Sequence, residues 1–254
     1  MNYKIKLLAL SSSLFALSTG AFAQFNLKNL KSDASKDLNN VLGKKGGSDA
    51  LSNDDIINGL KDALKVGSNN AGSSASKTDG FYKNDLIKVP FPPDAEKVRS
   101  TANDLGMQQQ VEDFIMSMNR AAEKAAVKSA PIFVNAVMSM NIDDGMKILK
   151  GPDNAATQYL QSKTSQQLHD AFLPVVKEAI DSVQVTKYWQ PLADAYNMVP
   201  GVTKVNPDLN EFVTQKALSG LFILLAQEEL KIRKDPVARV TDILKKVFGS
   251  LDKK

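Results

Sequence analysis

The chain contains no cysteine and one histidine among its 254 residues. Without cysteine it forms no disulfide, carries no lipid on an N-terminal cysteine and has no thiol nucleophile. A single histidine, His169, excludes a metal site built from several imidazoles. The di-iron sites of helix bundles need Glu-x-x-His pairs, and here Gln166 stands three positions before His169. We therefore interpret His169 as a surface or capping residue rather than a catalytic base.

The chain also lacks the short motifs of the common enzyme classes. It contains no G-x-S-x-G nucleophile elbow, no P-loop, no G-x-G-x-x-G and no H-E-x-x-H. The sequence therefore offers no catalytic residue, no cofactor-binding residue and no metal ligand, and we expect no cofactor. A non-enzymatic structural or interaction protein is the interpretation that these absences favour.

A strong excess of either charge is missing as well. The chain has 32 basic and 28 acidic residues, and residues 1–23 contribute two of the basic ones and none of the acidic ones. Removing that segment lowers the net charge from +4 to +2. Nucleic-acid-binding proteins carry a much stronger basic footprint, so we expect no nucleic acid among the partners.

The first 51 residues have the composition of an export segment followed by a tether. Residues 1–23 contain Lys4 and Lys6, an apolar stretch over residues 7–17, and the sequence Ala-Phe-Ala at the end. This pattern predicts a secretory signal peptide cleaved after Ala23, which is too short for a stable transmembrane anchor. Residues 24–51 are rich in Asn, Lys and Ser, which predicts a flexible tether. We expect an exported protein of the periplasm or cell envelope, not transmembrane after cleavage.

Residues 52–251 predict one all-α, bundle-like domain around a central apolar helix at residues 211–236. Positions 221–226 are apolar without interruption, which is typical of a helix buried on all sides. Lys216 and the pair Glu228-Glu229 flank this run too closely for the roughly 20 uncharged residues that a membrane span needs. Pro236 ends the helix.

The other segments predict shorter helices. Ser52 resembles an N-cap, Gly67 a C-cap, and the low-complexity residues 68–80 a loop that buries nothing. The prolines of residues 86–92 predict a short extended segment, either a strand or an arm laid over the helices. From Asp94 onward the apolar spacing is helical, and Pro174 is expected in the first turn of a new helix.

Several segments resemble one bacterial family, domain-of-unknown-function family 4197. The residues that carry the resemblance are Gly59-Leu60-Lys61, Asp79-Gly80-Phe81, Ser117 to Glu123, Ala155-Ala156-Thr157, Val213 to Phe222, Glu228 to Pro236 and Lys246 to Gly249. The resemblance covers nearly all of residues 53–250 and implies an exported, mostly helical protein. It implies no activity, substrate or catalytic residue.

Chemistry in this chain would come from one candidate polar cluster on two predicted helices. Its members are Asn119, Arg120, Glu123, Lys216, Glu228, Glu229, Arg233 and Asp235. A structural network would pair Arg233 with Glu229, and Arg120 with Glu123 or across to Glu228.

The alternative is a polar pocket at the Glu228/Glu229/Arg233 end, binding an anion, a sugar-like small molecule or a divalent cation, with weak hydrolase potential. Adjacent helical residues point about 100° apart, so Glu228 and Glu229 do not face one small target.

A third interpretation is peripheral membrane binding through the C-terminal helix predicted at residues 237–251. This helix has an apolar face with Arg239, Lys245 and Lys246 outside it, as an interfacial helix would. The simpler alternative is that the apolar face packs on the domain. The expected partner of this protein is unknown, with an envelope protein or a small molecule as the two possibilities.

Overall fold

The computed structural model describes residues 52–182, 185–198, 200–205 and 208–235, together with Arg239 and Lys245. These residues belong to one compact unit, residues 51–254. The predicted signal peptide, the predicted tether and most of the predicted C-terminal helix lie outside the described residues.

The described residues are helical apart from their connections. The elements are α2 (Asn53–Ser76), the 3₁₀ turn η1 (Pro93–Ala95), α3 (Glu96–Asp104), α4 (Gln108–Ala126), α5 (Ser129–Met138), α6 (Ile142–Lys150), α7 (Ala155–Ser182), α8 (Val185–Asn197) and α9 (Asn210–Lys234). No strand occurs in this part of the chain, so the all-α prediction is confirmed. Among the helices described, none is long and apolar enough to cross a membrane.

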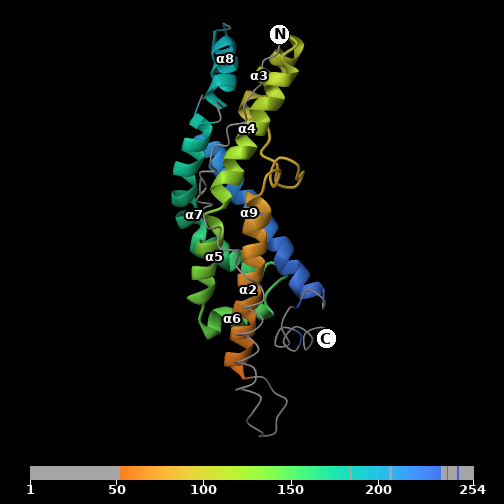
Figure 1. The fold of residues 1–254 in the computed structure, drawn as a ribbon, viewed down its shortest axis with the longest axis vertical. Coiled ribbons are helices and arrows are strands. Elements are labelled where there is room, and N and C mark those ends of the chain that lie inside the picture. Colours follow the sequence, from red (N-terminus) through yellow and green to blue (C-terminus); the bar gives the residue numbers. More distant parts are fainter. Residues whose placement is uncertain are drawn as a thin grey trace, which may run out of the picture. The chain divides into compact units, whose positions relative to one another are not determined.

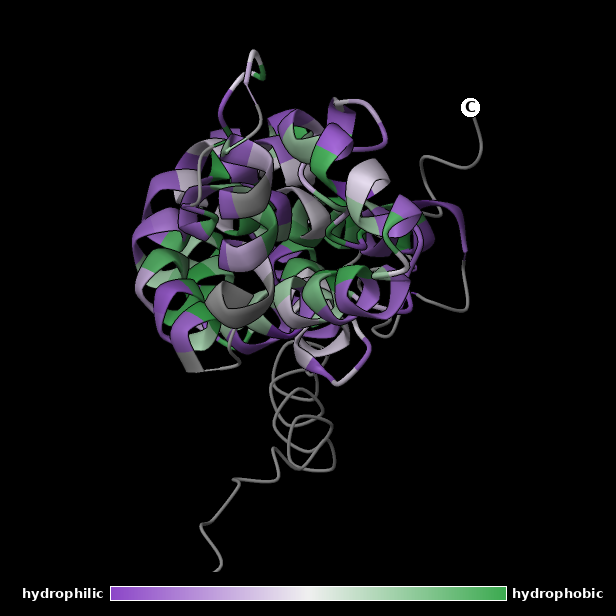
Figure 2. Ribbon diagram, turned by 90° about the horizontal axis from the view of Figure 1, so that it is seen from above, coloured by the Kyte–Doolittle hydropathy of each residue, from purple (hydrophilic) through white to green (hydrophobic). Residues whose placement is uncertain are grey.

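Helix α9 is the central element, as predicted. It packs against α7, α2 and α4, while α3 and α8 lie at one end of the unit and α6 lies at the other (Figure 1). The hydrophobic faces of the helices turn toward one another (Figure 2). The apolar run of α9 is not buried on every side, however, because Ile223 is 41% exposed.

Helix α2 is longer than the sequence predicts. It continues through Gly67 to Ser76, so the prediction of a loop at residues 68–80 that buries nothing is wrong for most of that segment. Ser68, Ala71, Gly72 and Ala75 are buried instead, because small side chains let α2 approach its neighbours closely. A Cβ atom on Gly72 would lie 2.9 Å from the Ser129 hydroxyl oxygen of α5. Close packing therefore outweighs the weak helix propensity of this stretch.

Pro174 does not begin a helix. It lies inside the continuous helix α7, against our prediction. An interior proline removes one backbone hydrogen bond and costs about 3 kcal/mol in an isolated helix. Phe172 and Val176 on either side of it are completely buried, and this tertiary packing offsets the local cost.

The segment that connects α2 to η1 makes turns over most of residues 77–87, and the predicted extended segment at residues 86–92 is free of turns only from residue 88 onward. We call residues 77–92 the arm. Phe81, Val89 and Phe91 of the arm are buried, and Phe91 packs edge-on against Phe114 of α4 and Trp189 of α8, with ring centroids 5.1 and 5.8 Å apart. The arm therefore forms part of the hydrophobic core rather than a surface loop.

Gly220 of α9 gives the arm the space to approach this closely. A Cβ atom at this position would lie 2.7 Å from Cε1 of Phe81 and 2.9 Å from Cβ of Ile87. Both arm residues are buried, and Cβ of Ile87 moves only with its backbone.

We expect Gly220→Ala to destabilise the protein by up to about 2 kcal/mol. The gain of about 1 kcal/mol in helix propensity is smaller than the cost of overpacking, which is about 1–3 kcal/mol. Urea unfolding followed by circular dichroism measures the difference, and Ser219→Ala at the exposed neighbouring position is the control. A Gly220→Ala protein as stable as the control would contradict the close approach of the arm.

Candidate functional site

The predicted polar cluster does not form one site. Asn119, Arg120 and Glu123 lie on α4 and contact the arm. Glu229 and Arg233 contact the start of α7 and the end of α6. The remaining three occupy other places: Glu228 bonds to α2, Lys216 lies over the Phe212 ring, and Asp235 caps the end of α9.

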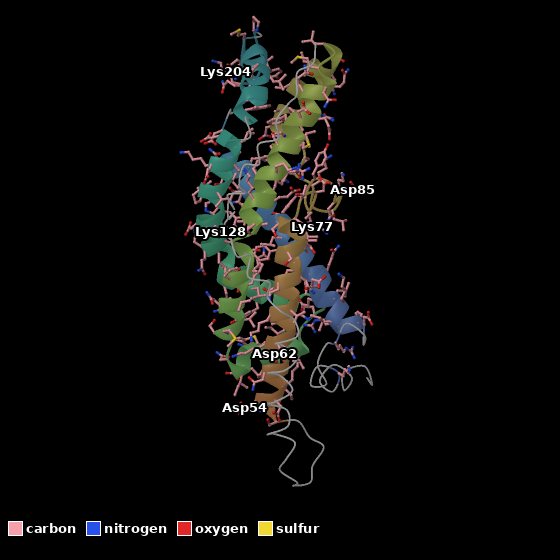
Figure 3. All side chains as sticks on the ribbon, viewed as in Figure 1. Asp54, Asp62, Lys77, Asp85, Lys128 and Lys204 are labelled. Atoms are coloured by element: carbon pink, nitrogen blue, oxygen red, sulfur yellow. The ribbon has the colours of Figure 1, made fainter. Side chains whose placement is uncertain are left out.

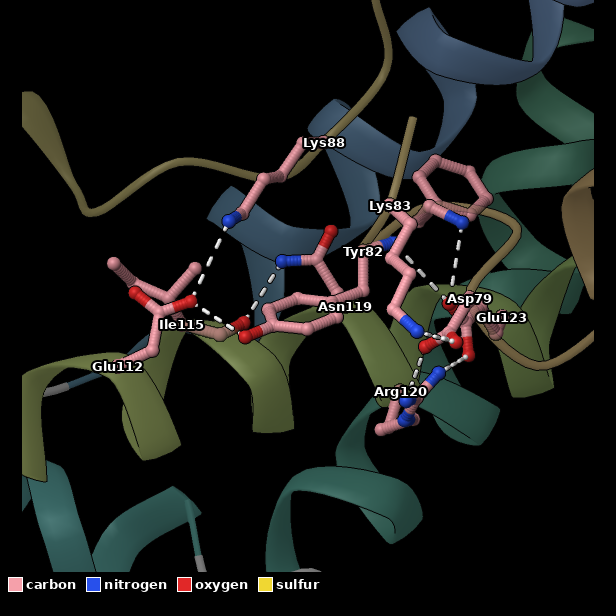
Figure 4. Close-up of polar contacts among 10 residues, drawn as sticks. Asp79, Tyr82, Lys83, Lys88, Glu112, Ile115, Asn119, Arg120 and Glu123 are labelled. Carbon is pink, nitrogen blue, oxygen red and sulfur yellow. Dashed lines mark hydrogen bonds and ion pairs between the residues drawn. The ribbon is translucent and has the colours of Figure 1, made fainter. Parts of the chain in front are cut away.

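The buried carboxylate of Glu123 holds the beginning of the arm. It is 4% exposed and accepts hydrogen bonds from the backbone N–H groups of Phe81 and Tyr82, at 3.1 and 3.2 Å (Figure 4). Arg120 donates to the same carboxylate at 2.7 Å and to Asp79 of the arm at 2.5 Å. Arg120 thus pairs with Glu123, the first of the two predicted alternatives, and also with Asp79, which was not predicted as a partner.

The side chain of Asn119 holds the end of the arm. Its amide oxygen accepts from the Val89 N–H at 2.8 Å, and its amide nitrogen donates to the Val89 carbonyl at 2.9 Å. The same nitrogen donates to the carbonyl of Ile115, as Figure 4 shows. Asn119 therefore satisfies both backbone hydrogen-bonding groups of Val89, as a neighbouring strand would. We call Asp79, Asn119, Arg120 and Glu123 the arm clamp.

Two charged contacts complete the surroundings of the arm. The Tyr82 hydroxyl donates to Glu112 at 2.5 Å, and this bond to a carboxylate raises the pKa of Tyr82. Lys83 and, second, Arg120 donate to the Asp79 carboxylate and lower its pKa. Asp79 is therefore ionised at neutral pH. It also adopts a positive φ of 65°, a conformation that Asp tolerates better than most residues.

Glu229 performs the same task at the start of α7. Its carboxylate accepts from the N–H groups of Ala156 and Thr157 at 2.9 and 2.8 Å, and from the Thr157 hydroxyl at 2.8 Å. These are N–H groups of the first helical turn, which have no partner within α7. A negative charge is also favourable at a helix N-terminus. A glutamate from α9 therefore caps α7.

Two arginines complete this second network. Arg233 pairs with Glu229 at 2.8 Å and donates to the carbonyl of Ile148 at the end of α6. Arg239 is 2% exposed and donates to the carbonyls of Ile232 and Arg233 at the end of α9. We call Glu229, Arg233, Ala156 and Thr157 the α7 clamp. The prediction of an interfacial helix required Arg239 to face outward, but the side chain of Arg239 is buried.

The space beside the α7 clamp is too small for a ligand. A cavity lined by Glu229, Arg233 and Ala156 measures about 10 Å³. A cavity of this volume is at the lower limit for a single water molecule. Among the residues that the structure describes, this cavity beside Glu229 has no room for a small molecule.

Glu228 instead faces an open cleft between α2, the arm and α9. The cleft measures about 400 Å³, and its charged lining residues are Lys77, Asp79, Lys83, Asp85, Glu228 and Lys231. Lys77 lies where the chain leaves α2, and Asp85 lies farther along the arm (Figure 3). Neighbouring residues of one helix thus point to different surroundings, as the 100° rotation between them predicts.

Salt bridges connect the charges inside the cleft. Lys83 pairs with Asp79 at 2.8 Å, and Lys231 pairs with Glu228 at 2.5 Å. Asn70 of α2 also donates to Glu228 at 2.8 Å. In the described part of the chain, no three Asp, Glu or His side chains are grouped to hold a metal ion. The arrangement offers both signs of charge to a small polar ligand.

Sequence reasoning missed most of the cleft. It named Glu228 but none of Lys77, Asp79, Lys83 or Asp85 as site residues, since it interpreted residues 68–80 as a loop without packing. The family resemblance included Asp79-Gly80-Phe81 and Ala155-Ala156-Thr157. These segments contain the partners of Arg120, Glu123 and Glu229. Their occurrence together in the family resemblance was the signal from which these contacts could have been predicted.

His169 lies away from the cleft, on α7. Its Nε2 atom is 3.0 Å from the Glu211 carboxylate of α9, and its side chain is 23% exposed. Glu211 and, less strongly, Asp170 raise the pKa of His169, while Gln215 and His169 lower the pKa of Glu211. The histidine thus connects two helices of the core.

One comparison with known proteins finds a relationship. A family model described as "Protein of unknown function (DUF4197)" matches residues 50–249. No curated protein and no solved structure matches the chain. The matched residues include both clamps and the cleft.

We expect Glu229→Gln to destabilise the protein by roughly 3–5 kcal/mol, because it removes the buried carboxylate charge that pairs with Arg233 and an acceptor from the start of α7. Glu228→Gln is the matched control, since it makes the same change one residue earlier at a more exposed pair worth about 1 kcal/mol or less. Chemical unfolding measures both. Equal losses in the two variants would refute the capping role of Glu229.

We expect the His169–Glu211 pair to make stability depend on pH. The raised pKa of His169 means that its contribution is complete below the unfolded value of 6.5 and is lost as the pH rises through the folded value. The advantage of the wild type over His169→Gln, of up to about 1 kcal/mol for a pair this exposed, should decrease from about pH 6 to about pH 8. Thermal melts across this range measure it, and parallel curves would show that the pair does not form.

Proposed function

The chain belongs to the DUF4197 family of proteins of unknown function, and we propose that it is an exported, non-enzymatic protein that binds a small polar ligand in the cleft. The single observation that carries this proposal is that Glu228 and its neighbours line an open cleft of about 400 Å³. Ligand sites in proteins generally have volumes of about 300–1,000 Å³.

The charged residues of the arm clamp and the α7 clamp have a structural role instead of a ligand-binding one. Glu123 and Glu229 are 4% and 5% exposed, and backbone N–H groups and arginines surround their carboxylates. Such groups are committed to the fold and are not presented to a ligand. The cleft residues differ, since their lysines are exposed to solvent.

A non-enzymatic role agrees with the chemistry of the cleft. The one histidine of the chain is on α7, where it pairs with Glu211, and it does not line the cleft. Two of the three cleft carboxylates, those of Asp79 and Glu228, are engaged with lysines, Arg120 or Asn70. Charged groups of this kind bind and orient a ligand. The described lining of the cleft contains no histidine that would act as a general base.

Export is supported by the sequence of residues 1–23, with its two lysines, apolar stretch and Ala-Phe-Ala ending. The protein is therefore expected to meet its ligand in the periplasm or cell envelope, after cleavage following Ala23. The mass of protein purified from the exported fraction checks this cleavage. A full-length N-terminus there would contradict it.

Nuclear magnetic resonance of the ¹⁵N-labelled mature protein tests ligand binding. Pools of small anions, amines, zwitterions and sugars are added separately. We expect at least one pool to shift the backbone amides of Gly80, Lys83 and Gln227 in a saturable manner. The amide of Gly145, on the distant helix α6, is the internal control.

Two outcomes would contradict the proposal. Saturable shifts centred away from the cleft, or no shift at the cleft from any pool, would exclude ligand binding there. Conversion of an added compound, visible in its own spectrum, would show that the protein is an enzyme.

A further inference from the structure

In each salt bridge of the cleft, the carboxylate is more buried and has more partners than the lysine. The carboxylate of Asp79 has a second partner in Arg120, and that of Glu228 has a second partner in Asn70. Their lysines, Lys83 and Lys231, have 71% and 61% of their side chains exposed, whereas the carboxylates are 28% and 16% exposed. Each carboxylate is therefore held by a second partner, whereas the side chain of each lysine is largely exposed to solvent.

A ligand can displace these lysines at low cost. Solvent-exposed salt bridges contribute only about 0–1 kcal/mol, because ordering a flexible lysine opposes the Coulomb attraction. A displaced ammonium group stays near the cleft on its four-carbon chain. It is then available to a negative group of the ligand.

Glu228 and Asp79 differ in the partner that each keeps after its lysine is displaced. Asp79 keeps the positive charge of Arg120 beside it, at 2.5 Å. Glu228 keeps only the neutral amide of Asn70. Glu228 therefore needs a positive group from the ligand more than Asp79 does.

The charges of the cleft are balanced. Besides the two pairs, Lys77 and Asp85 line the cleft, and neither has a charged partner in the part of the chain that the structure describes. A ligand with only negative charge would meet three carboxylates, and one with only positive charge would compete with three lysines. A ligand with both charges satisfies the two kinds of group together.

The remaining lining restricts the ligand further. Apart from Ala71, Gly80 and Leu224, the lining side chains are polar or charged, and none is aromatic. A nucleobase would lack an aromatic side chain to stack on. The cleft therefore fits a compact, aliphatic and strongly polar molecule.

We propose that the cleft binds a small zwitterion of the amino-acid class, with its ammonium group on Glu228 and its carboxylate held by Lys231 and Lys77. In this arrangement ion pairs from the ligand to Glu228, Lys231 and Lys77 replace the Lys231–Glu228 pair, and the balance of charge in the cleft is unchanged. The inference rests on the proposed function, because it specifies the ligand of the same cleft.

Isothermal titration calorimetry of the mature protein at low ionic strength tests the charge requirement. The probes are glycine, L-serine, L-glutamine and glycylglycine. For each one that binds, the N-acetyl derivative lacks the positive charge and the carboxamide derivative lacks the negative charge. We expect at least one zwitterion to bind, and both of its derivatives to bind at least tenfold more weakly.

Variants test the positions of the two charges. Glu228→Gln and Lys231→Met should each weaken binding of the zwitterion at least tenfold. Lys234→Met is the matched control, since Lys234 lies on the same helix with 64% of its side chain exposed but pairs with Asp153, outside the cleft. Its affinity should equal that of the wild type. Thermal melts confirm that the variants are folded.

The outcomes separate this inference from the proposed function. A derivative that binds as tightly as its parent zwitterion would overturn the inference while leaving a ligand in the cleft. The same holds if no zwitterion binds but another pool shifts the cleft amides in the magnetic resonance experiment. If Lys234→Met weakens binding as much as Lys231→Met, the site is not in the cleft and both proposals fail.

Discussion

The course of the arm depends on one buried carboxylate. Glu123 lies inside the core, where an ionised group is costly unless hydrogen bonds and a counter-charge compensate it. The backbone N–H groups of Phe81 and Tyr82 and the guanidinium of Arg120 supply that compensation. Because these partners lie on the arm and on α4, the carboxylate determines where the chain turns after α2. One wall of the cleft follows from that turn.

The α7 clamp uses the same physics at the other side of α9. A helix N-terminus presents unpaired N–H groups, and Glu229 satisfies them from a different helix while Arg233 balances its charge. This requirement fixes the rotation of α9 about its axis. With Glu229 turned toward α7, Glu228 must point toward α2 and the cleft. The buried clamp thus places the residue that the ligand would meet.

The sequence predicted the helical class, the central position of α9 and the non-helical end of the arm at residues 88–92, because apolar periodicity and prolines are local signals. It predicted Arg120–Glu123 and Glu229–Arg233 for the same reason, since each pair lies within one helix. Local signals could not reveal that Glu123 bonds to residues about 40 positions earlier, or Glu229 to residues about 70 positions earlier. They also failed at Pro174 and at Gly67, where tertiary packing outweighs the local preference.

The error at residues 68–80 explains why the cleft was missed. Serine, glycine and alanine have little side chain to bury, so the segment resembles a linker. Their small size is what allows α2 to lie close to α5 and to continue to Ser76. That extra length places Ser74 in the lining of the same cleft as Glu228, together with residues of the arm. Without it, Glu228 and Lys231 would form an ordinary surface pair on α9. The low-complexity stretch therefore makes that pair one side of an open cleft.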